Sequence, residues 1–408
     1  MSLAVVQGNV QSTDASVSSA GGAVVSIYDV TQSGDPLASL FTDRAGTTSA
    51  SNPVVADSGG FFRVYTAATR VRIVAEFDGN TQTWEDVALS VDGYDETTNI
   101  EPGLFWKDDG SAAAWEAPTT TTLQTKSAIQ AEVEGIRVVV PAATSVTLPA
   151  LSNGTDYFVY LASDGTLQAV DADSAAPSGE RLVGGFHCRA GDGEINPYSF
   201  WDLNWRPKSY PRAMAIDPGK NVWADIYLTD VEYTLYGYSR PGQTIADDGN
   251  RPILPATVGG DGTALCPSAS WWQFLDIFYA AGKCFGIYEE LVSLAYGVVE
   301  RQAVGSDPVT TQHQAGHRSA CGCEQITGVM WQWFSGASAT AGSSWSNIAE
   351  GRGDVYASNL KAPRFGASWN NGSSAGSRSS SWYDGPSSSS SRVGARGVSD
   401  HVNLQAEG

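Results

Sequence analysis

The fold of the C-terminal part is decided by residues 365–401, which read FGASWNNGSSAGSRSSSWYDGPSSSSSRVGARGVSDH. Serine dominates this stretch, yet four large apolar side chains are spaced through it, at Phe365, Trp369, Trp382 and Val398. A disordered Ser-rich tail lacks such residues, because it has no core in which to bury them. We therefore expect an ordered backbone that carries a small, polar surface, which suits binding better than catalysis.

Charge is distributed unevenly along the chain. The formal net charge is −20, and residues 301–408 hold eight Lys or Arg and seven Asp or Glu, so the first 300 residues carry −21. An acidic body repels nucleic acid and anionic membranes, and we expect neither as a partner. Within the near-neutral tail, Asp400 follows a GARG turn, and we expect it to pair inside the fold with Arg378 or Arg396.

The composition predicts a mostly β protein of two or three domains. The 408 residues include 44 glycines and many short alternating apolar runs, and no stretch approaches the ~20 apolar residues that span a bilayer. Five cysteines, an odd number without framework spacing, argue against a disulfide scaffold. The start MSLAVVQGNV lacks the features of a signal peptide, so we expect synthesis in a cytoplasm and release only as part of a particle.

The N-terminal residues 1–95 read as a small β module. Apolar runs at AVVSIYDV (23–30), FFRVYTA (61–67) and VRIVAEFDG (71–79) are joined by segments rich in turn residues. Together with SNPVVADSGGF (51–61), they resemble a module found at the N-terminus of many phage tail-fibre proteins, where it attaches the fibre to the virion. The alternative is a generic small β domain.

The centre of the chain divides into two segments. Residues 96–128 are mostly small and polar, and we interpret them as a linker or a trimer-forming stalk. Residues 129–205 alternate between apolar and polar, with IRVVVPAATSVTLPAL and TDYFVYLASDGTLQAV as strand segments and a turn at 163–166, and predict a second β domain.

Residues 206–408 predict an α+β domain with two amphipathic helices, at 268–283 and 287–300, followed by short strands such as GVMWQWFSG (328–336). The apolar faces expected for the two helices consist of Trp272, Leu275, Phe278 and Tyr279 in the first, and of Leu291, Leu294 and Ala295 in the second.

The chain from about residue 140 to its end resembles the phage major tropism determinant family. The shared segments include TLPALSNGTDYFVYLASDGTL, EINPYSFWDLNWRP, VWADIYL, GGDGTA, GRGDVYA and, in the tail, FGASW, WYDGPSSSS and VGARGVSDH. The resemblance implies a C-type-lectin-like fold, of the superfamily that includes formylglycine-generating enzymes, in a homotrimeric receptor-binding protein. We expect it not to cover residues 1–125, where the fibre-type module stands.

In that family, the tail presents a receptor-binding face whose side chains are diversified by a retroelement while the fold stays constant. Carried over residue by residue, the resemblance implies the displayed positions Ser368, Asn370, Gly372, Ser374, Ser381, Tyr383, Asp384, Ser388, Ser390, Arg392 and Val393. All eleven hold residue types that adenine-directed mutation of an AAC codon can reach. If the segment is extended, its period of two turns Trp369 inward between displayed neighbours, and Trp382 would repeat this arrangement.

A metal site is the first competing hypothesis. His313, His317, Cys321 and Cys323 lie in HQAGHRSACGC, whose spacing alone permits zinc binding. The family resemblance instead places both cysteines on a strand that leads into the GVMWQW core, buried as small apolar groups, with both histidines in a solvated loop. We therefore expect no metal and no cofactor.

Enzymatic chemistry is the second competing hypothesis. Formylglycine-generating enzymes use a cysteine pair near the end of the chain, but no cysteine follows Cys323. A tail-spike glycosidase needs two carboxylates in a cleft, for which Asp354, Asp384 and Asp400 are the late candidates. The GRGD at 351–354 belongs to the GRG-VYA pattern of the family rather than to an integrin motif.

The resulting hypothesis is a tail-fibre protein of the phage virion, made in the cytoplasm of a bacterial host. Its expected partners are a host cell-surface receptor, protein or glycan, and phage tail or baseplate proteins. Tyr383 and Arg392 would anchor weak contacts that trimerisation converts into avidity. Two alternatives stay open: a virion-associated glycan-degrading enzyme, which would release sugar, and a purely structural fibre component, which would not bind cells.

Overall fold

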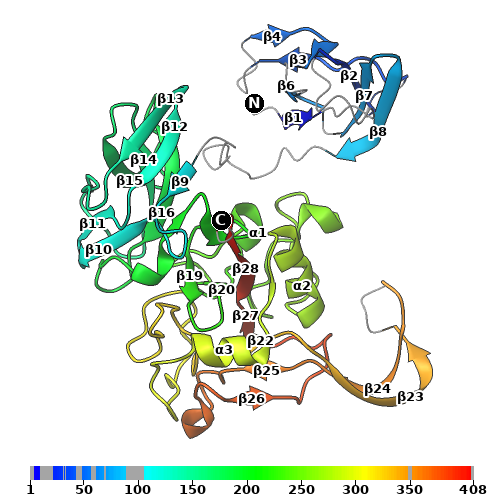
Figure 1. Cartoon of the computed structure of the whole chain (residues 1–408). Coiled ribbons are helices and arrows are strands. Elements are labelled where there is room, and N and C mark those ends of the chain that lie inside the picture. The colour runs from blue at the N-terminus through cyan, green and yellow to red at the C-terminus, as the bar shows by residue number, and fades with distance from the viewer. Residues whose placement is uncertain are drawn as a thin grey trace. The chain divides into compact units, whose positions relative to one another are not determined.

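The computed structural model describes residues 4–9, 22–30, 32, 34–42, 48–56, 61–68, 70–88, 105–347 and 352–405. The chain divides into two compact units, Met1–Asn99 and Ile100–Gly408, in which strands outnumber helices (Figure 1). This confirms the predicted mostly β architecture with a mixed C-terminal part. Among the described helices, none has the length and apolar character needed to cross a membrane.

The first unit consists of two four-stranded sheets that enclose one apolar core. Alternate residues of β2 and β7 point into this core, as the sequence pattern predicted. The side chain of Asn52 accepts a hydrogen bond from Ile27 N and donates to Ile27 O and Ala38 O, which connects β2 to the segment around Ala38. The sheet orders are β1-β6-β3-β4 and β5-β2-β7-β8. The strands are β1 Ala4–Asn9, β2 Val24–Asp29, β3 Leu40–Phe41, β4 Ser49–Ala50, β5 Val54–Val55, β6 Phe61–Thr66, β7 Arg70–Phe77 and β8 Asn80–Ala88. Residues 57–60 of the module resemblance lie outside the described residues.

The second unit begins with strands where we expected a linker or stalk. Residues 105–128 hold β9, β10 and β11, whose Phe105, Trp115 and Leu123 are buried in the same core as Ile129 and Val159 of the following strands. The small and polar residues of this segment occupy the turns and outward positions, which is why composition suggested a linker. The strands of this part are β9 Phe105–Lys107, β10 Trp115–Thr119, β11 Thr122–Thr125, β12 Ile129–Val133, β13 Ile136–Val140, β14 Asp156–Leu161, β15 Leu167–Asp171, β16 Arg181–His187 and β17 Trp201–Asp202.

The last strand of the chain, β28, is central to the rest of the second unit. It lies between β18 and β20 in a sheet of order β18-β28-β20-β19, with β21 also paired to β28 (Figure 1). The C-terminal residues therefore complete a core begun two hundred residues earlier. The elements from β18 onward are β18 Trp205–Pro207, β19 Met214–Asp217, β20 Val222–Asp225, β21 Cys284–Phe285, β22 Trp331–Trp333, β23 Ser338–Ser346, β24 Val355–Lys361, β25 Arg364–Phe365, β26 Ser380–Ser381, β27 Val393–Ala395 and β28 Gly397–Asn403, with short 3-10 turns η2 Pro197–Ser199, η3 Ala256–Val258 and η4 Gly372–Ser374.

Three helices, α1 (Tyr233–Tyr236), α2 (Trp271–Ala280) and α3 (Tyr288–Leu294), accompany these sheets. In α3, the predicted Leu291, Leu294 and Ala295 are buried, although the helix ends earlier than expected. In α2, the predicted face is only partly correct: Phe278 is buried and Leu275 packs against the core, but Tyr279 is exposed, and Gln273, Phe274 and Ile277 are buried as well. Apolar residues occupy nearly every side of α2, so its periodicity cannot select one face.

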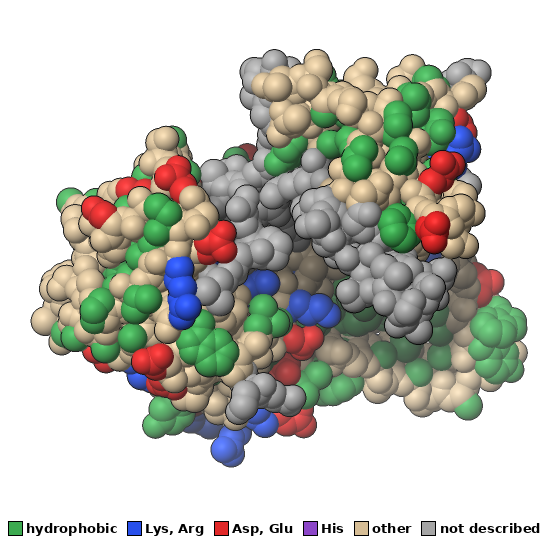
Figure 2. Space-filling model, turned by 45° about the horizontal axis from the view of Figure 1, so that its top comes forward, with side chains coloured by type: hydrophobic (Ala, Val, Ile, Leu, Met, Phe, Trp, Pro, Cys, Tyr) green, Lys and Arg blue, Asp and Glu red, His purple; other side chains and the backbone are tan. Residues whose placement is uncertain are grey.

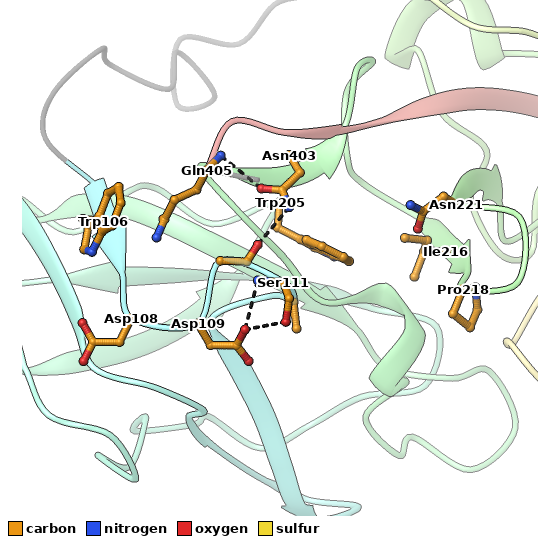
Figure 3. A pocket seen from close by; sticks show the side chains of 12 residues that line it. Trp106, Asp108, Asp109, Ser111, Trp205, Ile216, Pro218, Asn221, Asn403 and Gln405 are labelled. Atoms are coloured by element: carbon orange, nitrogen blue, oxygen red, sulfur yellow. Dashed lines mark hydrogen bonds between the residues drawn. The ribbon is translucent and has the colours of Figure 1, made fainter. Parts of the chain in front are cut away.

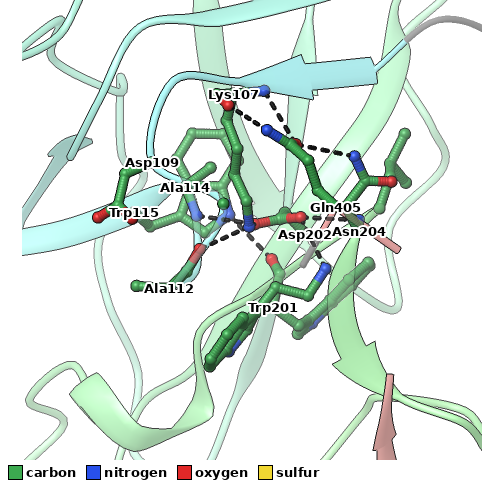
Figure 4. Close-up of polar contacts among 12 residues, drawn as sticks. Lys107, Asp109, Ala112, Ala114, Trp115, Trp201, Asp202, Asn204 and Gln405 are labelled. Atoms are coloured by element: carbon green, nitrogen blue, oxygen red, sulfur yellow. Dashed lines mark hydrogen bonds and ion pairs between the residues drawn. The ribbon is translucent and has the colours of Figure 1, made fainter. Parts of the chain in front are cut away.

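A buried ion pair joins β9 to β17 within the second unit, and Gln405 links the C-terminal residues to the same place (Figure 4). Lys107 Nζ lies 2.7 Å from Asp202 Oδ2, and both side chains are fully buried. Burial lowers the pKa of Lys107 and raises that of Asp202, whereas the attraction between the two opposes both shifts. Gln405 Oε1 accepts hydrogen bonds from Lys107 N and Asn204 Nδ2, each at 3.2 Å, so the C-terminal residues cap β9.

Arg396 is a second buried cation, and it corrects the ion pairing expected in the tail. Its guanidinium donates to Gln332 Oε1 at 3.1 Å and to the carbonyls of Asp225, Ile226 and Glu324. Asp400, the expected partner, is exposed instead. Alternation along β28 turns Ser399 inward and Asp400 outward, which separates the carboxylate from this site.

Candidate functional site

The tail residues build one face of a small four-stranded sheet of order β26-β25-β22-β27. Its register places Ser381, Arg364 and Trp333 opposite one another on three neighbouring strands. Trp331, two residues before Trp333, lies on the same face, whereas Gln332 points the other way and binds Arg396. The side chains of Trp331, Trp333 and Arg364 thus lie on one face of the sheet and form the floor of a pocket.

A pocket of about 390 Å³ lies above this floor, and we call it the tail pocket. It is lined by Trp331, Trp333, Arg364, Asn371, Ser381, Tyr383, Asp384, Ser388, Ser389, Ser390, Arg392 and Val393. Seven of the eleven positions inferred from the tail are among them, from Ser381 to Val393. The structure therefore brings together all of the positions in that set from Ser381 onward.

Arg364 is the central charged group of the tail pocket. Its guanidinium forms an ion pair with Asp384, donates to Ser381 Oγ at 3.0 Å, and lies 5.3 Å from the ring centroid of Trp331. Burial lowers the pKa of Arg364, and the positive charge of Arg392 acts in the same direction, whereas Asp384 opposes both. Two guanidinium groups therefore share this site with one carboxylate.

Hydrogen bonds from the loop between β26 and β27 attach its backbone to the backbone of neighbouring segments. Asp384 O, Pro386 O and Arg392 O accept hydrogen bonds from Ala362 N, Trp271 N and Trp331 N at 2.9 to 3.0 Å. Each of these bonds uses main-chain atoms only, so it does not depend on which side chain the loop residue carries. The side chain of Ser389 adds a hydrogen bond from Ala269 N and one to Asp248, so the loop can keep its shape while exposed side chains such as Tyr383 and Arg392 vary.

Tyr383 and Arg392 have the exposed side chains expected of contact residues. Tyr383 is 77% exposed, and Lys361 Nζ lies 5.4 Å from the centroid of its ring while also donating to Tyr383 O. Arg392 is exposed as well, and its guanidinium makes no hydrogen bond or ion pair with the described residues. Both side chains are available for a partner.

The structure corrects four details of the predicted face. The side chains of Ser368 and Val393 are each only 1% exposed, so neither is displayed. Trp369 is half-buried, and Trp382, expected to point inward, is 46% exposed although its ring packs edge-on against Phe334.

For Ser368 and Trp369, the cause is the backbone of the 368–374 segment, which is not extended. Asn371 N donates to Ser368 O, and a 3-10 turn, η4, follows, so a period of two does not apply. Asn370, Gly372 and Ser374 are exposed on this turn but do not line the tail pocket.

Five lining residues were missed in the sequence: Trp331, Trp333, Arg364, Asn371 and Ser389. The W-Q-W alternation at 331–333 was a usable signal, because two aromatics at a spacing of two share one face of a strand. Arg364 and Asn371 carry no such pattern.

The four residues of the zinc hypothesis do not converge. His313 Nδ1 lies 3.1 Å from each carboxylate oxygen of Glu324, while His317 Nδ1 lies 2.7 Å from Thr327 O. Both cysteines are buried, as expected, but in a turn rather than a strand, and His317 is buried rather than solvated. Within the described residues, no three His, Cys, Asp or Glu side chains are grouped to hold a metal ion.

The carboxylates named in the glycosidase hypothesis do not form a catalytic pair in the tail pocket. Asp384 is the one carboxylate among the residues that line the tail pocket, and it is paired with Arg364. A glycosidase requires a second acid across the cleft. Among its lining residues, the tail pocket offers no such pair.

A second, wider pocket of about 920 Å³ lies where β9, β18 and β28 meet, and we call it the junction pocket (Figure 3). It is lined by Trp106, Asp108, Asp109, Gly110, Ser111, Ala112, Trp205, Ile216, Pro218, Asn221, Asn403 and Gln405. Several of its polar side chains hold neighbouring backbone: Asp109 Oδ1 accepts from Ser111 N at 2.9 Å, and Asn403 Nδ2 donates to Gly110 O at 2.8 Å. These groups are already satisfied within the fold.

Comparison with known proteins agrees with the tail motifs. A family model described as "Mtd second domain" matches residues 113–202. The "Tail fiber receptor-binding protein" of Bordetella phage BPP-1 is 35% identical over 368 residues, covering 84% of this chain and 96% of that protein. Solved structures of the major tropism determinant M1 and P3c variants superpose with TM-scores of 0.69 at 33% and 34% identity, each over 82% of this chain and 92% and 93% of theirs.

These matches extend further toward the N-terminus than we expected. Residues 126–408 are 283 of the 408 residues, about 69% of the chain, so a match over 84% must also include earlier residues. The structural matches establish the C-type-lectin-like fold that the tail motifs implied. The chain belongs to the major tropism determinant family of phage proteins.

Proposed function

We propose that this protein is a phage tail-fibre receptor-binding protein and that the tail pocket and its rim contact the host receptor. The observation that carries the proposal is the combination of a backbone-anchored loop with exposed Tyr383 and Arg392 side chains. Tyrosine and arginine are enriched at interface hot spots, and serine supplies adaptable hydrogen bonds around them. Such a surface binds its partner without performing chemistry on it.

The displayed set in this proposal consists of Asn370, Gly372, Ser374, Ser381, Tyr383, Asp384, Ser388, Ser390 and Arg392. Because the loop is held through main-chain atoms, substitutions at its exposed positions leave the scaffold intact. That property supports diversification of the tail by a retroelement, since a varied surface is useful only on a constant fold.

We further propose a homotrimer in the virion, attached to phage tail or baseplate proteins through the N-terminal unit after synthesis in the host cytoplasm. Two features of the hairpin β23–β24 favour this trimer proposal. The hairpin extends from the second unit (Figure 1), and the rings of Trp345 and Tyr356, which lie 5.2 Å apart, are 68% and 51% exposed. A lone two-stranded hairpin is marginally stable in water, so a neighbouring subunit would stabilise it. Three copies of one weak site would also bind with avidity.

The test is adsorption of the purified full-length protein to host cells, wild type against the double variant Tyr383→Ala, Arg392→Ala. We expect the double variant to lose adsorption, whereas its oligomeric mass by light scattering and its Tm should stay nearly unchanged, because both side chains are exposed. Arg378→Ala, at an exposed arginine of the same tail outside the pocket, is the matched control.

Unchanged adsorption of the double variant would place the receptor site elsewhere on the protein. Release of sugar from host envelopes would favour the glycan-degrading alternative. Absence of wild-type adsorption would favour a purely structural fibre component.

A further inference from the structure

The tail pocket is positively charged on a chain whose formal net charge is −20. Arg364 and Arg392 line it, Lys361 lies at its rim beside Tyr383, and Asp384 is the one carboxylate among the lining residues. The lining residues alone give a balance of +1, and at the rim Lys361 is offset by Asp248, whose carboxylate accepts a hydrogen bond from Ser389 Oγ at 2.6 Å. On the described part of the face drawn in Figure 2, Lys and Arg side chains (blue) are scattered among Asp and Glu (red) and uncharged side chains.

The exposed Arg392 guanidinium is an accessible hydrogen-bond donor of this pocket, and it has no partner among the described residues. Arg364 Nε and Trp333 Nε1 also lack partners among these residues, but both atoms are buried and cannot reach a ligand. A ligand for this pocket should therefore bring acceptors for Arg392, and negative charge would offset the repulsion between Arg392 and Arg364.

The remaining lining groups favour a sugar ring over a protein surface. A volume of about 390 Å³ lies at the lower end of the range for small-ligand sites, and a protein partner would need a far larger and flatter contact. Ser388 and Ser390 present hydroxyl groups that both donate and accept, as sugar hydroxyls do. The exposed ring of Tyr383 offers a flat apolar face at the rim.

We propose that the tail pocket binds an acidic sugar unit of a host-surface glycan through its carboxylate. Arg392 receives the carboxylate by paired N–H donors, the serine hydroxyls contact the sugar hydroxyls, and the ring of Tyr383 packs against the sugar ring. The inference rests on the proposed function, because it names the class of receptor that the same site recognises.

The test is saturation-transfer NMR on the full-length protein with glucuronate, galacturonate and N-acetylneuraminate, and with glucose as the neutral control. We expect saturable binding of at least one acid and none of glucose. Arg392→Gln should weaken the binding by about tenfold or more, the loss typical of a charged hydrogen bond. Arg378→Gln, the matched exposed arginine outside the pocket, should leave it unchanged.

Three outcomes would overturn the inference. The first is failure of all three acids to bind. The second is displacement of the bound acid by inorganic phosphate or a triglutamate peptide at equal concentration, which would mark a general anion site or an acidic-peptide site. The third is an equal response of the Arg392→Gln and Arg378→Gln variants.

Adsorption to host cells separates this inference from the proposed function. If the acid that binds best also inhibits adsorption, the inference is supported. If adsorption depends on Tyr383 and Arg392 but no acidic sugar inhibits it, the proposed function stands and the glycan inference is wrong. If adsorption is independent of both residues, the proposed function itself is wrong.

Discussion

The junction pocket and the tail pocket differ in what their polar side chains do. In the junction pocket, Asp109 and Asn403 bind nearby backbone, and the adjacent Gln405 caps β9. In the tail pocket, the loop is held by main-chain bonds, and the side chains of Tyr383 and Arg392 stay exposed. The larger of the two hollows is thus part of the scaffold, and the smaller is suited to binding.

Pocket size is therefore a poor guide to function in this chain. A polar group that is satisfied internally stabilises the fold, and a ligand that competes for it must replace those bonds. A polar group held out by a rigid backbone can bind a ligand without that cost. The two pockets should therefore respond to substitution in opposite ways: stability should change at the junction, and binding should change at the tail.

The largest effect is expected beneath the junction pocket, at Asp202. Asp202→Ala removes the carboxylate that pairs with Lys107 and accepts hydrogen bonds from Ala114 N and Asn204 N. The variant leaves a buried ammonium without its counter-charge, so we expect the free energy of unfolding to fall by about 3–5 kcal/mol. Chemical denaturation of the full-length protein measures this loss.

Asp108→Ala is the matched control for that experiment. Asp108 lines the same pocket but is exposed, so its substitution should change the free energy of unfolding by less than about 0.5 kcal/mol. Equal losses in the two variants would show that the buried pair does not stabilise the junction.

Much of the fold could be predicted from alternation, because sheet strands with one buried face impose a period of two. The strands at 23–30, 61–67 and 71–79, and the turn at 163–166, agree with the structure for this reason. For residues 105–128, the expected linker was wrong because long-range burial of Phe105 and Trp115 outweighs a polar local composition. Burial of a side chain against strands far away in the sequence leaves little signal in the residues next to it.

The positions from Ser381 to Val393 that line the tail pocket were inferred from the family resemblance and not from periodicity, because most of them lie in the loop between β26 and β27. Periodicity failed at Ser368, which is buried by a turn that the period of two did not foresee. Arg364 could not have been identified from spacing, because its role depends on the cross-strand register that sets it beside Trp333 and Ser381. Register of short strands is a tertiary property.

A smaller effect is expected in the tail pocket, at Asp384. Asp384→Asn removes the internal partner of Arg364 and raises the local positive charge, so binding of an acidic sugar should strengthen severalfold. The partly exposed ion pair contributes little to the fold, so the free energy of unfolding should fall by only about 1 kcal/mol. The same NMR titration and denaturation measure both quantities.

Asp400→Asn, at an exposed carboxylate of the same tail outside the pocket, is the control for Asp384→Asn. Weaker binding by the Asp384 variant would indicate that this carboxylate positions Arg364 for the ligand rather than competing with it.

The smallest effect is expected at Asp109, and it depends on pH. Hydrogen bonds from Ser111 and contact with Lys126 lower the pKa of Asp109 to about 2. A depressed pKa stabilises the folded state above the ordinary carboxyl pKa, and this stabilisation is lost as the pH falls through about 2. Asp109→Asn cannot titrate, so its free energy of unfolding should be lower at pH 7 and decline less between pH 4 and pH 2 than in the wild type. Because the Asp109 side chain is 34% exposed, solvent screening should keep the difference below about 1 kcal/mol. Denaturation at a series of pH values measures it, and parallel acid limbs in the two proteins would contradict the assignment of Asp109 to the scaffold.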